Sequence, residues 1–390
     1  MKKSICILYS TLLVVTAALQ PISASAQDGI TSTTIKIGTM GALSGPLAPI
    51  IVPQFNAIEA VFEEANAAGG IHGRKILFVR EDDECLPSKG VGAVRKLIHE
   101  VKPFIIVGGG CSNSGIAQKP EIIAAKIPWI ITAATADALS EPANPYIYTS
   151  MSTAWSETYG MLQYAIDQGK TRIAVVWQPD AWGKARLEPL KEALKKKGIT
   201  PIAIEEVAVE PSDLTPTALK LKALNPDAVL MLLFPKAAVP FLRDSAKIGL
   251  QPLSIGGSPL VEIDQIAKGA GRADTVKNVR VVAAPGFGVD DPQVAKWKER
   301  IEKRFGDRFN LYHLFGVAGG QFAVEALKKA GPNPTREKIM EVMSNLQTKV
   351  DVYAGPIKCT PTDHQCHKTL GIFALIDGRV SGVGSTTPAR

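Results

Sequence analysis

The sequence has few of the residues from which most enzyme active sites are built. It contains only five histidines and five cysteines in 390 residues. No histidine falls in a nucleophile or metalloprotease motif, and no glycine-rich loop carries the lysine of a Walker-type nucleotide site. We therefore expect no cofactor and a protein that is not an enzyme.

Long runs of one charge are absent as well. The 44 lysines and arginines against 37 acidic residues give a net charge of +7. The densest basic cluster, Lys195-Lys196-Lys197, is typical of the solvated end of a helix, where cations complement the helix dipole. A nucleic-acid-binding face needs more clustered positive charge than this. We expect no nucleic-acid partner.

Only one long apolar run occurs, and it lies at the N-terminus. Lys2 and Lys3 precede an apolar stretch over residues 5–19, and the small residues Ala24-Ser25-Ala26 follow it. The stretch is shorter than the about 20 residues needed to span a membrane, and this arrangement is typical of a secretory signal peptide. We expect residues 1–26 to be removed, and the remaining chain to be soluble in the periplasm.

Four cysteines remain after that cleavage, in two clusters. These are Cys85 with Cys111, and Cys359 with Cys366. An even number in an exported protein favours disulfides, although sequence alone permits three pairings. A metal site is the alternative for the second cluster, which holds Cys359, Asp363, His364, Cys366 and His367. No recognised metal-ligand spacing is completed there, so we expect no metal.

Beyond residue 27, short apolar, β-branched runs alternate with longer helical patterns. In the first helix, Ile58, Val61, Phe62 and Ala65 recur at helical spacing before Gly69. Strands are expected at 34–40, 76–80, 104–107 and 129–132, and helices before 69, at 88–100 and from about 113. This alternation predicts βαβ units, and hence one doubly wound α/β half with a parallel sheet.

The alternation pauses around residues 146–150 and then restarts, which marks a candidate domain boundary. The second series has expected strands at 173–177, 201–209, 228–234 and 253–256, and helices at 154–168, up to 198, 215–223 and 237–248. After a strand at 279–284, helical patterns at 294–304, 314–329 and 336–346 precede a last strand at 371–376. Because no strands separate these three helices, we expect them to cover the first sheet, so that the chain crosses between the halves more than once.

Small, hydroxyl-bearing loops follow three strands of the first half, at 42–46, 108–113 and 133–135. Ligands of open parallel sheets bind beyond the carboxyl ends of the strands, where unpaired N–H groups favour anions. Such loops let the backbone approach a carboxylate, although ordinary tight turns are the alternative. The candidate ligand-binding residues are Ser44, Ser112, Ala133, Ala134 and Thr135, with Trp182, Phe234 and Ser258 at equivalent positions of the second half.

Two further interpretations of these loops are open. The segment 108–112 is compatible with a nucleophile turn, but Cys111 would then need a free thiolate rather than a disulfide. The acidic run 81–84 is compatible with calcium binding or acid–base chemistry, and a solvated loop is the simpler interpretation.

Four segments, 41–46, 66–74, 81–85 and 107–112, in this order and behind a signal peptide, resemble the leucine/isoleucine/valine-binding family. The resemblance covers nearly all of residues 27–390. It implies the type I periplasmic binding fold, with two Rossmann-like lobes joined by a three-segment hinge. Such lobes close on a ligand and deliver it to an inner-membrane permease, with no chemistry on the ligand.

The resemblance also assigns residues to roles. Ser112 and Thr135, with the main chain of Ala133 and Ala134, match the groups that hold the ligand carboxylate and ammonium, and Trp182 and Phe234 match the aromatic wall. Cys85 with Cys111 matches the family disulfide. The implied division is 27–148 plus 285–355 for lobe 1 and 149–284 plus 356–390 for lobe 2, with hinge segments near 148–152, 282–286 and 352–360.

Two departures from the amino-acid binders bear on the ligand. Those proteins place a carboxylate after the strand at 253–256 to neutralise the ammonium, whereas this chain has Gly257-Ser258-Pro259, with Glu262 further along as the alternative counter-ion. A buried ammonium without a counter-ion costs several kcal/mol. The first loop also has Pro49-Ile50 in place of the family's aromatic residue. We therefore favour a carboxylic acid with an apolar or aromatic body over leucine.

The sequence thus predicts a monomeric periplasmic substrate-binding protein of a branched-chain amino acid type ABC importer. Its partners would be a small carboxylate-bearing solute and an inner-membrane ABC permease. The alternative is a periplasmic sensor that presents the same ligand to a receptor kinase, for which the fold and pocket would be identical.

Overall fold

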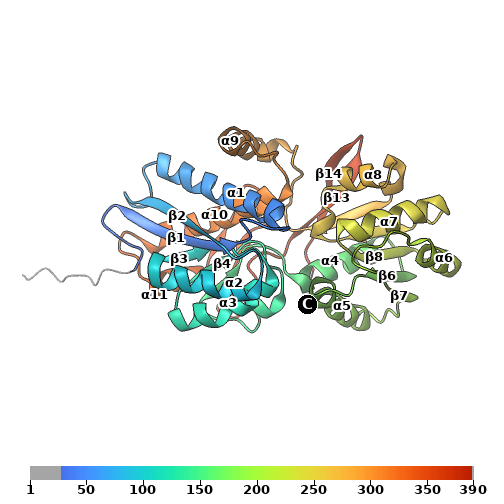
Figure 1. Cartoon of the computed structure of the whole chain (residues 1–390), viewed down its shortest axis with the longest axis horizontal. Coiled ribbons are helices and arrows are strands. Elements are labelled where there is room, and N and C mark those ends of the chain that lie inside the picture. The colour runs from blue at the N-terminus through green and yellow to red at the C-terminus, as the bar shows by residue number, and fades with distance from the viewer. Residues whose placement is uncertain (1–27, 389–390) are drawn as a thin grey trace, which may run out of the picture.

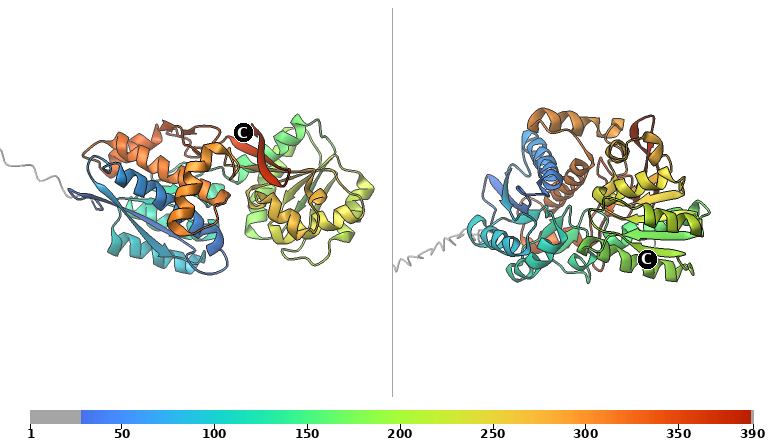
Figure 2. Two further views of the ribbon diagram at one scale, coloured as in Figure 1. Left: turned by 90° about the horizontal axis from the view of Figure 1, so that it is seen from above. Right: turned by 45° about the vertical axis from the view of Figure 1, so that its right-hand side comes forward.

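The computed structural model describes residues 28–388 as two α/β lobes that lie side by side (Figure 1). The expected signal peptide, residues 1–26, lies outside the described residues. Each lobe has its own sheet covered by helices, as Figure 2 shows from two further directions. The expected fold class, two doubly wound α/β lobes, is confirmed. Within residues 28–388, no helix has the length and apolar character needed to cross a membrane.

The first lobe is built on a five-stranded parallel sheet in the order β2-β1-β3-β4-β5. Its strands are β1 (Thr34–Gly41), β2 (Lys75–Asp82), β3 (Ile105–Val107), β4 (Trp129–Ile131) and β5 (Ile147–Thr149). The connecting helices are α1 (Ala48–Ala67), α2 (Pro87–Lys96) and α3 (Ser112–Ala125). Every residue of β3, β4 and β5 is buried, because helices cover both faces of the sheet.

The second lobe is built on a seven-stranded sheet in the order β14-β13-β10-β9-β8-β6-β7. Its parallel strands are β6 (Ile173–Trp177), β7 (Ala203–Glu206), β8 (Ala228–Leu232), β9 (Leu253–Gly256) and β10 (Val279–Ala283). The hairpin β13 (Leu370–Ile376) and β14 (Arg379–Thr386) extends the sheet beyond β10, with β13 antiparallel to β10 and β14 at the edge. The helices are α4 (Ala154–Asp167), α5 (Ala181–Lys196), α6 (Thr215–Leu224), α7 (Pro235–Lys247) and α8 (Ile263–Gly269).

Three later helices return to the first lobe, as expected. They are α9 (Ala295–Phe305), α10 (Leu311–Ala330) and α11 (Arg336–Ser344), and α10 lies beside α1 in Figure 1. Glycine allows this close approach, since a Cβ at Gly316 would lie 2.1 Å from the carbonyl oxygen of Gln54. The chain therefore leaves the first lobe and comes back to it.

Three crossings connect the lobes, at residues 150–153, 284–294 and 367–369. Before the third crossing, the chain forms β11 (Gln347–Thr348) and β12 (Ile357–Lys358) and then runs beside β5. The N–H of Thr149 donates to the carbonyl of His364 (2.9 Å), and the N–H of Cys366 donates to the carbonyl of Thr149 (3.1 Å). The third crossing therefore follows residue 366, later than the expected hinge segment 352–360. The residue boundaries of the two lobes stay a prediction.

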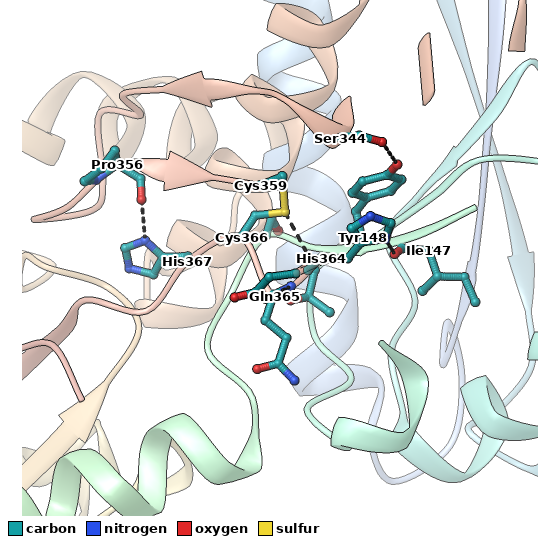
Figure 3. The surroundings of a disulfide bond; sticks show 12 residues. Ile147, Tyr148, Ser344, Pro356, Cys359, His364, Gln365, Cys366 and His367 are labelled. Carbon is teal, nitrogen blue, oxygen red and sulfur yellow. Dashed lines mark hydrogen bonds between the residues drawn. A yellow bond between two sulfur atoms is a disulfide. The ribbon is translucent and has the colours of Figure 1, made fainter. Parts of the chain in front are cut away.

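The structure contains two disulfides: Cys85–Cys111, the pairing that the resemblance implied, and Cys359–Cys366, a pairing that the sequence left open. Cys85–Cys111 joins the end of β2 to the start of α3, and Cys359–Cys366 closes a short loop beside β5 (Figure 3). In that loop, the ring of His364 stacks on Tyr148 with centroids 4.1 Å apart. Both thiols of the second cluster are used in the disulfide, and no group of three or more potential ligands within residues 28–388 is placed to hold a metal.

Candidate ligand-binding site

The loop after β4 carries unpaired backbone donors beside the first turn of α3. The N–H groups of Ala133, Ala134 and Thr135 make no hydrogen bond within residues 28–388. The hydroxyl of Ser112, the first residue of α3, accepts from the N–H of Ala136 (3.1 Å) and ties the loop to the helix. Unpaired N–H groups beyond the carboxyl end of a parallel strand favour an anion.

Ser44 has a different environment from the other predicted hydroxyls. Its side chain is exposed and donates to Asp82 Oδ2 (2.6 Å), while the N–H of Leu43 donates to Asp82 Oδ1 (2.9 Å). Ser44 therefore stabilises the turn after β1. It makes no hydrogen bond to Ser112 or Thr135.

The two predicted aromatic residues of the second lobe meet. Trp182 and Phe234 have ring centroids 4.7 Å apart. The buried amide of Gln178, which follows β6, accepts from the N–H of Phe234 (2.7 Å) and donates to the carboxylate of Asp180 (2.5 Å). Asp180 in turn caps α5 by accepting from the N–H of Gly183 (2.7 Å). The side chain of Gln178 thereby links the start of α5 to the start of α7 and holds Trp182 and Phe234 close together.

A buried ion pair that the sequence analysis did not find lies next to this pair of rings. Glu157 is 1% exposed and Arg186 is 2% exposed, and Arg186 Nε donates to Glu157 Oε2 (2.9 Å). Glu157 lies in the first turn of α4, where the helix dipole favours a carboxylate. Arg186 lies one turn beyond Trp182 on α5, and its guanidinium carbon is 3.9 Å from the centroid of the Trp182 ring.

The ion pair connects residues from both lobes. Arg186 Nη2 donates to the hydroxyl of Thr135 (3.0 Å), and Glu157 Oε1 accepts both the N–H of Ser258 (2.7 Å) and its hydroxyl. A Cβ at Gly257 would lie 2.9 Å from the carboxyl carbon of Glu157, so glycine makes room for the carboxylate. We call Thr135, Glu157, Trp182, Arg186 and Ser258 the Arg186 cluster.

The structure thus brings most of the predicted residues together. Thr135, Trp182 and Ser258 belong to the Arg186 cluster, Phe234 contacts Trp182, and Ser112 supports the loop 133–136. The carboxylate that reaches Ser258 is Glu157, not Glu262. Glu262 begins α8, and burial with repulsion from Asp264 raises its pKa above the ordinary value. The expectation that no carboxylate stands at Ser258 was therefore incomplete.

A separate open cavity of about 670 Å³ lies beside the disulfide loop and shares no lining residue with the Arg186 cluster. Trp155, Lys368 and the segments 140–143 and 362–365 line it, together with Pro388. Gln365 spans this region, since it accepts from the hydroxyl of Thr153 (3.0 Å) and donates to Glu141 (2.9 Å). None of the predicted strand-end loops lines this cavity.

Comparison with known proteins gives one consistent family. Residues 34–379 match the periplasmic binding protein family. The chain is 26% identical over 327 residues to the Leu/Ile/Val-binding protein homolog 7 of Brucella abortus, with 80% of each chain covered.

Solved structures show the same fold. The solute-binding protein of an ABC transporter from Rhodopseudomonas palustris BisB5, in complex with 3,4-dihydroxybenzoic acid, matches with a TM-score of 0.75 at 22% identity, covering 92% of this chain and 98% of that one. The branched-chain amino acid transporter protein LivJ from Streptococcus pneumoniae, in complex with isoleucine, matches with a TM-score of 0.74 at 18% identity, covering 91% and 99%. These matches confirm the type I fold and the resemblance found in the sequence, and the chain belongs to the family of periplasmic binding proteins.

Proposed function

We propose that this chain is the solute-binding component of an ABC importer. It works as a monomer in the periplasm, where the expected signal peptide at residues 1–26 directs it, and it hands its solute to an inner-membrane permease. The family, the Leu/Ile/Val-binding relative and the transporter proteins of similar fold support this proposal. The solute is released unchanged.

The solute carries a carboxylate, which binds between the two lobes. The observation that carries this assignment is the set of unpaired N–H groups at Ala133, Ala134 and Thr135, which adjoin the Thr135 hydroxyl and a buried guanidinium. Directed donors at one point are what a carboxylate requires, and charge-assisted hydrogen bonds of this kind are the strongest available. Ser112 holds the loop in place, and Ser44 lies in the turn after β1, at the same carboxyl edge of the sheet.

The remainder of the solute is apolar or aromatic. Trp182 and Phe234 present ring surface next to the donor groups, which suits an apolar body. We favour an aromatic or aliphatic carboxylic acid over an amino acid. The Rhodopseudomonas palustris relative binds 3,4-dihydroxybenzoic acid, whereas the Streptococcus pneumoniae relative binds isoleucine, so this fold serves both ligand classes.

Capture follows from relative movement of the two lobes about the three crossings at residues 150–153, 284–294 and 367–369. Ligand groups held at 133–135 belong to the first lobe, while the aromatic pair belongs to the second, so a solute that contacts both sets stabilises the closed arrangement.

A thermal-shift screen tests this function. Residues 27–390 are unfolded, freed of bound solute, refolded and screened against branched-chain amino acids and a panel of aromatic and aliphatic carboxylic acids. Because a ligand that binds only the native state raises the melting temperature, at least one carboxylate-bearing compound should do so. If no carboxylate shifts the melting temperature but neutral sugars or cations do, the assignment of the solute class is wrong.

A further inference from the structure

Hydrogen bonds within the protein occupy most of the acceptor sites of the Glu157 carboxylate. One oxygen accepts from Arg186 Nε (2.9 Å), and the other accepts from the N–H and the hydroxyl of Ser258. Its charge is compensated by a guanidinium that is itself 2% exposed. A ligand ammonium at this carboxylate would lie beside the buried cation of Arg186, and displacing Arg186 would leave that cation unpaired.

Arg186 also fixes the hydrogen-bonding direction at Thr135. A guanidinium only donates, so in the 3.0 Å contact the hydroxyl oxygen of Thr135 is the acceptor. The hydroxyl proton makes no hydrogen bond within residues 28–388 and is available to a ligand. The free proton favours a ligand atom that accepts a hydrogen bond, such as a carboxylate oxygen, and the adjacent guanidinium charge disfavours an ammonium at Thr135.

The guanidinium retains donors of its own. Nε and Nη2 are used by Glu157 and Thr135, whereas Nη1 makes no hydrogen bond among the described residues. One other carboxyl, Asp137, lies close enough for its charge to interact with Arg186. The oxygens of Asp137 accept from the N–H of Trp155 (3.1 Å) and the amide of Gln365 (3.3 Å), so they serve the start of α4 and the disulfide loop.

We propose that the guanidinium of Arg186 occupies the position in which an amino-acid ligand would need to place its ammonium group. Arg186 thereby makes the site selective for carboxylates that lack an ammonium group. This inference rests on the proposed function and deepens it, because it names the residue that sets the ligand class. Arg186 contributes an extra donor to the carboxylate and, through Glu157, removes the counter-ion that an ammonium requires.

Ligand pairs that differ only in the ammonium group test this without any mutation. The pairs are 4-methylpentanoate with leucine, and 3-phenylpropanoate with phenylalanine, titrated calorimetrically into ligand-free residues 27–390. The acid of each pair should bind about 30-fold or more tightly than its amino acid, since an uncompensated charge in a buried site costs at least this much.

The variant Arg186→Met should reverse the preference. It frees the Glu157 carboxylate to pair with an ammonium, so leucine or phenylalanine gains affinity while the matched acid loses about tenfold or more. The double variant Glu157→Gln with Arg186→Met leaves neither partner charged and should lose the acid preference without gaining affinity for amino acids. Arg95→Met, which removes an exposed arginine paired with Glu121, is the matched control and should bind like the wild type.

The possible outcomes distinguish a failure of the inference about Arg186 from a failure of the proposed transport function. Equal or tighter binding of the amino acid by the wild-type protein overturns the role of Arg186 and leaves a carboxylate-binding transporter component. Failure of the wild-type protein to bind either pair or any other carboxylate overturns the proposed function itself. If Arg186→Met does not fold, as circular dichroism would show, the wild-type pairs and the double variant still decide the matter.

Discussion

The guanidinium of Arg186, on α5 of the second lobe, donates a 3.0 Å hydrogen bond to the hydroxyl of Thr135, in the loop after β4 of the first lobe. Both side chains are buried, and the contact links two segments that lie 51 residues apart in the chain. These two residues therefore link the lobes, and under the proposed function they also contact the ligand.

Replacing Thr135 by valine keeps the side-chain shape and removes the hydroxyl. We expect the affinity for 3-phenylpropanoate to fall about tenfold, because one directed hydrogen bond to a charged group is worth about 1.5 to 3 kcal/mol. Calorimetric titration measures the change. Thr33→Val, at an exposed position before β1, is the control; an unchanged affinity in Thr135→Val would show that the carboxylate binds elsewhere.

Phe234→Ala removes half of the aromatic pair. The affinity for 3-phenylpropanoate should drop by about 1 to 2 kcal/mol and more than the affinity for 4-methylpentanoate, because ring–ring contacts add to plain apolar burial. The two acids are titrated into the variant and the wild type in parallel. Equal losses for both acids would indicate that the ring contributes only apolar surface, and no loss would place the ligand body away from Trp182 and Phe234.

The sequence predicted the positions of interior strands more accurately than those of the edge strands β5 and β14. The expected bounds of β6 and β9 match the structure to the residue. For β6 the signal is a continuous apolar, β-branched run, which is typical of a strand buried on both faces. The three-residue β5 was expected only as a pause in the pattern, and β14 was missed because its glycines have low strand propensity. The turn Asp377-Gly378 between β13 and β14, with φ of 50° and 75°, was the one available hairpin signal.

The strand-end loops of the candidate site could be predicted from the sequence, but its charged pair could not. Glu157 and Arg186 occur in helices, where charged residues usually face solvent. Their burial depends on partners 29 to 101 residues away in the chain. Sequence separation of this size carries no local pattern, so the pair became visible only once both lobes were assembled.

Acid should destabilise the protein through a buried histidine. Burial lowers the pKa of His367 to about 4, and burial also lowers the pKa of His364. Because both groups are neutral in the folded state and take up protons more readily when unfolded, their contribution is complete above pH 6.5 and is lost as the pH falls from about 6.5 towards 4. For His367 alone the loss is about 3 kcal/mol.

Urea denaturation at several pH values between 7 and 4 measures this dependence. His367→Phe, which keeps a ring against Tyr353, should flatten the profile, whereas the exposed His99→Phe should leave it unchanged. A wild-type profile that shows no more acid sensitivity than His367→Phe would contradict the buried neutral state of His367.

The disulfide Cys359–Cys366 should stabilise the fold without taking part in binding. Replacing both cysteines with serine removes a short covalent loop, and we expect a loss of about 2 to 3 kcal/mol in the free energy of unfolding. The affinity for 3-phenylpropanoate should change little, since within residues 28–388 the side chain of Gln365 in this loop bonds to Thr153, Asp137 and Glu141 and not to the Arg186 cluster. A large loss of affinity at unchanged stability would instead make this loop part of the binding mechanism.

Capture between two closing lobes is tested most directly by small-angle X-ray scattering of residues 27–390, with and without a saturating carboxylate chosen from the thermal-shift screen. A ligand that contacts donors of the first lobe and rings of the second lobe stabilises the closed form. We predict a smaller radius of gyration in the presence of ligand. Identical radii in the two states, with binding confirmed by calorimetry on the same sample, would contradict the closing mechanism.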